Sequence, residues 1–348
     1  MSEKDTFQDP ETVSLLRNFH QLRIGVYFAD FLIAVSLAWF FYIVSVKSAG
    51  APLQFASLAA ACLLMYRSIY FTHELAHQKF RFKKEKTFRV FYVAWHVLCG
   101  IPMLAPGFLY HDLHLEHHSK QLYNNPNDGE YERYGSSSPW LIVKSLVGQW
   151  AVGLLSIPRF SILTPVSFLF PKLRKRVEER MSFMGLYLEY RRKPPSEGVR
   201  AVWLAEELIA CLFVNSILFM VFSGRLSGQW IIHWLIITEV SLTLNYFRAL
   251  TAHRYRGTGE VMSFNEHILD SVTVAGNPFW TELWAPVGIR YHSLHHWFPQ
   301  IPYCHLSEAH QTLMQKLPEN HPYRKTIERS FFSAMSRLIK DGRSAQAA

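Results

Sequence analysis

The sequence predicts an all-α integral membrane protein in which four transmembrane helices form two hairpins and an aqueous helical cap carries a histidine-rich metal site. The chain has 348 residues, of which 49% are hydrophobic and 15% aromatic. Its mean hydropathy of +0.03 resembles that of a soluble protein. The apolar residues, however, are concentrated in stretches of roughly 20 residues, the length needed to cross the hydrocarbon core of a bilayer. Histidine clusters follow these stretches in the polar parts of the chain.

Two pairs of apolar stretches are expected to cross the membrane as helical hairpins. Gly50 and Pro52 favour a tight turn in the first pair, and residues 223–229 form the turn in the second. The predicted spans are residues 24–46, 52–72, 203–222 and 230–247. The turns carry few basic residues, whereas residues 79–89 and 172–200 carry many. Under the positive-inside rule, this asymmetry places the basic segments and both termini in the cytoplasm.

Two further apolar stretches, residues 90–109 and 140–170, are expected not to cross the membrane. Both are interrupted by prolines and glycines. If residues 90–109 crossed the bilayer, the histidine cluster that begins at His111 would lie on the opposite side from His73 and His77. A single metal site forbids this arrangement. Each stretch should therefore enter and leave by the same leaflet or lie along the membrane surface.

The chain is expected to comprise a cytosolic N-terminal segment (1–23), a membrane domain (24–305) and a cytosolic C-terminal tail (306–348). Residues 124–138, NNPNDGEYERYGSSS, are rich in turn-forming residues and predict a surface loop. The four cysteines have no CxxC spacing, so a disulfide framework is not indicated. Basic loops beside an anionic leaflet account for the net charge of +9. No nucleic-acid partner is expected.

Three groups of histidines have the spacing of a single helix face, because positions i, i+3 and i+4 of a helix lie together. HLEHH at residues 114–118 and HSLHH at residues 292–296 share the spacing HxxHH, and HELAH at residues 73–77 has the spacing HxxxH. The groups supply eight imidazoles, from His73, His77, His114, His117, His118, His292, His295 and His296. Imidazole is a ligand that suits Fe, Zn, Cu and Ni.

This number of imidazoles predicts two metal ions. A structural zinc needs four ligands and a catalytic zinc three, whereas two six-coordinate irons with open positions for dioxygen would use eight or more. His253 follows the fourth predicted span and is placed to be a ninth ligand. His111 lies on the same arc as His114 and could be a ligand, a partner of a ligand or a solvated residue.

Other polar residues near the clusters are candidates for supporting roles. Asp112, Glu116 and Asp270 could orient ligating imidazoles through their second ring nitrogen, although Glu116 projects away from the histidine face and is expected to be solvated. Isolated histidines are usually structural rather than ligating. This expectation applies to His20, His96, His233, His267, His305, His310 and His321.

HELAH, HLEHH and HSLHH, in this order and separated by membrane hairpins, resemble the three histidine boxes of the membrane fatty-acid desaturase and hydroxylase superfamily. The run YHSLHHWFPQIPYCHLSEAH from Tyr291 and the preceding NYFRALTAHRY are similar to its bacterial fatty-acid desaturase branch. The resemblance implies that the eight box histidines and His253 bind a non-haem diiron centre. In one respect the chain departs from the animal acyl-CoA branch, where an Asn that holds a water precedes the additional ligand by four residues. That position is Ala249 here, and Asn245 lies eight residues before His253.

By this resemblance the protein would use dioxygen and two electrons to oxidise an unactivated C–H bond of a fatty acyl chain in the bacterial inner membrane. Desaturation is the simplest product, with hydroxylation, or oxidative decarboxylation of a free fatty acid to a terminal alkene, as alternatives. The chain has no dinucleotide fingerprint and no haem-binding HPGG motif. Electrons are therefore expected from a separate ferredoxin- or rubredoxin-like protein that docks on the basic cytosolic face.

Three other classes of protein fit part of the pattern. HELAH also satisfies HExxH, with Glu74 in the general-base position of an intramembrane zinc protease, but this reading leaves both HxxHH clusters unexplained. A metal transporter would hold its ligands within the membrane rather than at its edge. Soluble ferritin-like diiron enzymes use paired ExxH motifs, and only Glu74 to His77 has this spacing.

Overall fold

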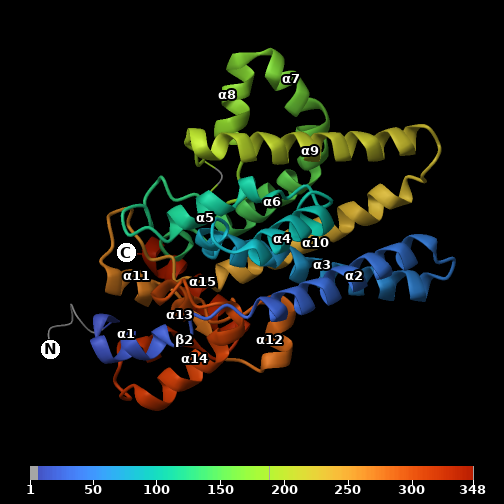
Figure 1. The fold of residues 1–348 in the computed structure, drawn as a ribbon. Coiled ribbons are helices and arrows are strands. Elements are labelled where there is room, and N and C mark those ends of the chain that lie inside the picture. The colour runs from blue at the N-terminus through green and yellow to red at the C-terminus, as the bar shows by residue number, and fades with distance from the viewer. Residues whose placement is uncertain (1–6, 188, 348) are drawn as a thin grey trace.

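The computed structural model describes residues 7–187 and 189–347, so the first six residues of the predicted N-terminal segment lie outside the described residues. Helices α2 (Ile24–Lys47) and α3 (Ala51–His77) form one hairpin, and α9 (Glu197–Phe222) and α10 (Gln229–Leu250) form the other. Figure 1 shows both hairpins projecting to one side, with the shorter helices gathered at their other end. We call the end that carries the two turns the outer end and the opposite end the inner end.

Four described helical stretches are long and apolar enough to cross a membrane, namely 24–47, 51–77, 140–169 and 197–222. Three of them coincide with the predicted spans 24–46, 52–72 and 203–222. The fourth predicted span, residues 230–247, forms α10 but is not among these four. We attribute this to the polar side chains of α10, among them His233, Glu239 and Asn245, which interrupt its apolar surface.

The remaining elements lie between and beyond the hairpins. Between them come η2 (Lys79–Arg81), α4 (Lys86–Trp95), the π-helical η3 (His96–Gly100), η4 (Gly107–Leu109), α5 (His111–His117), η5 (Tyr134–Ser136), α6 (Trp140–Pro158), the π-helical η6 (Arg159–Leu163), α7 (Thr164–Leu169) and α8 (Pro171–Arg180). The N-terminal α1 (Pro10–Arg17) precedes them, and α11 (Phe264–Asp270), β1 (Thr273–Val274), α12 (Pro278–Trp284), α13 (His292–Trp297), α14 (Tyr303–Lys316), η7 (Pro322–Thr326), β2 (Ile327–Glu328) and α15 (Phe331–Ala347) follow.

The segment from α4 to η4 enters the bundle and turns back within it. At the tip, the indole of Trp234, near the outer end of α10, donates a hydrogen bond to the carbonyl of Pro102 over 2.8 Å. On the return, the amide of Phe108 donates to Glu206 of α9 over 2.8 Å. The segment thus begins and ends toward the inner end of the long helices, in agreement with the expectation for residues 90–109. The turn follows the π-helical η3, a type of irregularity that bends helices.

The segment from α6 to α8 likewise enters the bundle and turns back within it. Near its start, the Tyr246 hydroxyl donates to the carbonyl of Ile142 over 2.7 Å. At its deepest point, Asn215 donates to the carbonyl of Ser161 in η6 over 3.2 Å, and Arg174 of α8 then pairs with Glu207 at 2.7 Å. The stretch is long enough to span a membrane by itself, but η6 bends it back toward the inner end. That residues 140–170 do not cross the bilayer stays a prediction.

Two consecutive glutamates of α9 hold the two returning segments. Glu206 accepts hydrogen bonds from Tyr92 at 2.7 Å and lies 3.1 Å from His96. Glu207, with no exposed surface, pairs with Arg159 at 2.9 Å and Arg174 at 2.7 Å. A buried charge requires a partner, because desolvation is costly. These two carboxylates therefore fix both returning segments against α9.

The chain beyond α13, expected to be a polar tail, packs into the group of short helices at the inner end. Strand β2 pairs in parallel with β1, with Thr273 opposite Ile327, so the described residues include a small two-stranded sheet among the helices. Leu306, Ala309 and Leu313 of α14 are buried. The indole of Trp297 donates to the carbonyl of Phe7 over 2.8 Å, which ties the N-terminal segment to α13. These contacts fix the position of α13 from several sides.

We predict that Glu207→Gln destabilises the folded protein by about 3 kcal/mol or more, because it leaves the buried Arg159 guanidinium without its counter-charge. Thermal unfolding of the detergent-solubilised protein measures the effect. Glu179→Gln is the matched control, since Glu179 pairs at 3.7 Å with Lys175, whose side chain is 76% exposed, and such surface pairs contribute about 0–1 kcal/mol. Equal unfolding temperatures for the two variants would show that the buried pair does not hold the returning segment.

Candidate metal centre

Eight of the nine predicted ligands form two compact groups of buried imidazoles. Site A contains His73, His77, His114 and His295, and site B contains His117, His253, His292 and His296. Within each site, one ring nitrogen from every histidine lies within 4.8 Å of the others. The boxes on α3, α5 and α13 therefore converge, although 219 positions separate His73 from His292.

The ninth predicted ligand, His118, lies between the two sites. Its Nε2 is 3.1 Å from Nε2 of His295 in site A, and its ring stacks on His296 of site B with centroids 4.1 Å apart. His253 comes just after α10 and is held by an isolated β-bridge to Ser271. All nine predicted histidines thus belong to one continuous cluster at the inner end of the long helices.

The ring nitrogens are placed to bind cations rather than one another. In site B, Nε2 of His253 lies 3.2 Å from Nε2 of His117 and 2.9 Å from Nε2 of His292. Two nitrogens at right angles around one ion at about 2.1 Å would be about 3 Å apart. In site A, Nε2 of His73, His77 and His114 is buried without a hydrogen-bond partner. Such orphaned acceptors fit a pair of metal ions.

Burial keeps these imidazoles in the neutral form that binds metals. It lowers the pKa of His114 and His118 well below the usual value, and the neighbouring histidines lower it further. The same causes act on His292 and His296. His117 is different. Burial lowers its pKa, but the charge of Asp128, the hydrogen bond to it and the nearby Glu130 together raise the pKa above its usual value.

Carboxylates fix the tautomers of the histidines on α5. Nδ1 of His117 donates to Asp128, with 2.9 Å between the atoms, and Nδ1 of His114 donates to Glu130 over 3.0 Å. Asp128 has no exposed surface. Because a neutral imidazole carries one proton, donation from Nδ1 leaves Nε2 free to bind a metal.

A second set of contacts fixes the histidines of site B. Nδ1 of His253 lies 2.9 Å from the Tyr123 hydroxyl, which donates its own proton to Asp270 over 2.7 Å. The Tyr123 oxygen therefore accepts from His253. Nδ1 of His296 lies 2.7 Å from Nε2 of His267. Both ligand candidates again present Nε2 to the cluster.

These supporting residues agree only partly with those suggested by the sequence. Asp270 acts on His253 through Tyr123, but Asp112 pairs with Lys79 at 2.6 Å and Glu116 accepts from Tyr190 at 3.2 Å, both away from the sites. His111 is buried and contacts Thr72 at 3.1 Å rather than joining either site.

The expectation of a surface loop at residues 124–138 is wrong in part. This loop folds inward because Asp128 and Glu130 hydrogen-bond to the histidines and Tyr131 donates to Asp270 over 2.9 Å. The sequence signal that could have revealed it is a pair of carboxylates shortly after HLEHH. His267 was expected to be an isolated histidine. It contacts the predicted ligand His296, because the fold packs α11 against α13.

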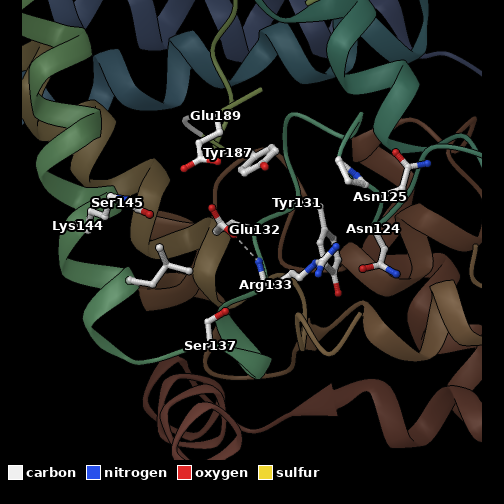
Figure 2. Close-up of a pocket in the computed structure, with 12 residues that line it drawn as sticks. Asn124, Asn125, Tyr131, Glu132, Arg133, Ser137, Lys144, Ser145, Tyr187 and Glu189 are labelled. Carbon is white, nitrogen blue, oxygen red and sulfur yellow. Dashed lines mark hydrogen bonds between the residues drawn. The ribbon is translucent and has the colours of Figure 1, made fainter. Parts of the chain in front are cut away.

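The outer side of this loop lines a separate polar pocket of about 330 Å³. Glu132 and Arg133 of the loop, Lys144 of α6 and Glu189 line it (Figure 2). Among the described residues that line the pocket, none is one of the nine histidines. Opposite charges are balanced around this pocket, which is distinct from the metal sites.

We predict that Asp128→Asn weakens metal binding by about 10- to 100-fold, the usual effect of removing a carboxylate that supports a ligand. The metal retained after dialysis against graded chelator concentrations measures this loss. Asp112→Asn is the matched control, because Asp112 lies on α5 but pairs with Lys79. If the Asp128 variant retained metal as well as the Asp112 variant did, Asp128 would have no role in fixing His117.

The comparisons with known proteins agree with this geometry. The model of the family described as fatty acid desaturase matches residues 49–327. The ceramide hydroxylase of Caulobacter vibrioides (strain NA1000 / CB15N) is 28% identical over 330 residues, which cover 95% of this chain and 92% of that protein. The matched region contains all three histidine boxes and His253. The chain therefore belongs to the fatty acid desaturase family and is an oxidoreductase.

Proposed function

We propose that the protein binds two iron ions at sites A and B and oxidises an unactivated C–H bond of a lipid acyl chain with dioxygen and two electrons. The observation that supports this proposal is the pair of four-histidine sites, joined by His118, at the inner end of apolar helices. When bound, the two irons would supply the reducing power and the coordination positions that activate dioxygen.

The side chains around the sites would act by orientation and by exclusion of water. Asp128 and Glu130 keep the Nε2 atoms of His117 and His114 unprotonated. Eight of the nine histidines are buried, and His118 is half-buried. A reactive oxidant formed in such a site would be protected from water and would act on the chain held beside it.

Hydroxylation of a ceramide-class lipid is the first candidate reaction, because the relative that covers nearly the whole chain is a ceramide hydroxylase. Desaturation is the second, because the family model is that of fatty acid desaturases. Both consume one dioxygen, two electrons and two protons. Hydroxylation inserts one oxygen atom into a C–H bond and releases one water, whereas desaturation removes two hydrogens and releases two waters. Oxidative decarboxylation of a free fatty acid is a further outcome that product analysis would detect.

The electrons would come from a separate ferredoxin- or rubredoxin-like protein. The basic residues of segments 79–89 and 172–200 offer a docking face for an acidic donor. We place the protein in the bacterial inner membrane, with both termini and the metal centre on the cytoplasmic side. The charge asymmetry between the outer turns and the inner segments supports this orientation.

The protease alternative is not supported by the position of Glu74. Its carboxylate accepts hydrogen bonds from the Tyr27 hydroxyl and from the amide of Tyr303, the latter over 3.1 Å. Glu74 is buried with only 2% of its surface exposed. A general base must reach the attacking water, and Glu74 is instead engaged in packing α3 against α2 and α14.

Lipid analysis of cells that express the protein tests the proposal. With a ferredoxin system and ceramide present, we expect a new lipid heavier by one oxygen atom, and no such product from His117→Ala or His295→Ala. Each variant removes one proposed ligand, His117 from site B and His295 from site A. The measurement is liquid chromatography with tandem mass spectrometry, with bound iron determined in parallel.

His310→Ala is the matched control, because His310 contacts Tyr323 at 2.7 Å and is not part of either site. It should retain the activity. A lipid two hydrogens lighter would select desaturation, and a terminal alkene one carbon shorter would select decarboxylation. An unchanged lipid profile from iron-loaded wild-type protein with an active reductant would contradict the proposal.

A further inference from the structure

A cationic side chain near site A lacks an anionic partner. Arg248 lies in the last turn of α10, and its guanidinium carbon is 5.2 Å from the centre of the Tyr70 ring. One terminal nitrogen donates to the side-chain oxygen of Asn245 over 2.9 Å. Its Nε is buried without a hydrogen-bond partner. In the described part of the chain, no ion pair involves Arg248.

Tyr70 beside it has a second unsatisfied group. Its side chain is 5% exposed, and its hydroxyl is buried without a hydrogen-bond partner. The Tyr70 ring stacks on His73 of site A, with centroids 5.9 Å apart and 28° between the planes. Arg248 is therefore separated from a proposed metal ligand by a single aromatic ring.

Arg248 and Tyr70 each have a buried polar atom without a hydrogen-bond partner, Nε in Arg248 and the hydroxyl oxygen in Tyr70. A buried donor without an acceptor is costly, and a half-buried guanidinium without a counter-charge adds to that cost. The Arg248 guanidinium and the Tyr70 hydroxyl lie close together beside site A. A bound ligand with a hydrogen-bond acceptor would satisfy both groups.

Arg248 and Tyr70 lie near the level at which the membrane interface, and thus the polar groups of lipids, are expected. Tyr66, one turn before Tyr70 on α3, donates to the carbonyl of Trp284 at the end of α12 over 2.9 Å. Helix α12 exposes 66% of Phe279 and 65% of Trp280. Exposed aromatic residues at the ends of apolar helices are typical of the membrane interface. Arg248 and Tyr70 thus lie where the polar end of a lipid would lie, next to the metals.

We propose that Arg248 and Tyr70 bind an oxygen atom at the polar end of the lipid substrate, either the amide carbonyl or a hydroxyl of an N-acylated sphingoid lipid. This inference rests on the proposed function and adds a position to it. If the polar end is held one ring away from site A, the carbon that reaches the metals lies close to that polar end. An enzyme that oxidises a carbon in the middle of a long acyl chain would instead hold the polar end of the lipid far from the metals.

Equilibrium binding without a reductant tests the anchor, because no turnover occurs. We expect Arg248→Gln to raise the Kd for ceramide in nanodiscs by about 10- to 100-fold, as removal of a hydrogen bond to a charged group does. Analogues of ceramide that lack the 1-hydroxyl or the 3-hydroxyl, or that carry a thioamide, identify the oxygen. The analogue without the bound oxygen should bind equally weakly to the wild type and to the variant.

Two further variants separate binding from folding. Arg248→Lys keeps the charge and should lose less affinity than Arg248→Gln, and Tyr70→Phe removes only the hydroxyl and should weaken binding with unchanged iron content. Arg225→Gln is the matched control, since Arg225 lies in the outer turn over Phe219. Its Kd should equal that of the wild type.

The position of the oxidised carbon gives an independent readout. Tandem mass spectrometry of the wild-type product should place the new oxygen or double bond close to the polar end, and Arg248→Gln should spread it over neighbouring carbons. An unchanged Kd in Arg248→Gln, or oxidation of the wild-type substrate in the middle of the chain, would overturn the inference. A wild-type protein that binds ceramide through Arg248 but never oxidises it would contradict only the proposed function.

Discussion

The convergence of nine imidazoles, eight of them buried, within a few ångströms of one another is the constraint on which the rest of the structure depends. Nε2 of His253 faces two other Nε2 atoms at 3.2 and 2.9 Å, and protons cannot satisfy all of these contacts. Cations in the centre, and hydrogen-bond acceptors behind the rings, resolve the conflict. Asp128, Glu130 and the Tyr123–Asp270 pair supply those acceptors, which explains why a loop rich in turn residues is buried.

The architecture serves to bring these histidines to one end of the apolar helices. Helix α3 and the end of α10 deliver His73, His77 and His253, and two returning segments allow α5 and α13 to approach from the same side. The buried pair Glu206 and Glu207 of α9 secures those segments. The histidine cluster therefore lies at the inner end of the apolar helices.

Much of this arrangement could be predicted from the sequence, because histidine spacing reports helix faces and a single metal site restricts how often the chain crosses the membrane. That restriction predicted the return of residues 90–109 and 140–170. The roles of Asp128, Glu130 and His267 could not be predicted. A carboxylate in a polar loop resembles a solvated one until tertiary contacts bury it, and His267 is isolated in sequence. Residues 230–247 were predicted to be an ordinary transmembrane span. The prediction did not take into account the polar side chains that interrupt the apolar surface of α10.

The metal content of the purified protein tests the central claim most directly. We expect two iron ions per chain after anaerobic reconstitution, measured by mass spectrometry of the metal, with X-ray absorption showing a coordination shell dominated by imidazole nitrogen. One tightly bound zinc per chain, or a shell dominated by oxygen, would contradict the assignment of sites A and B as a pair of iron sites.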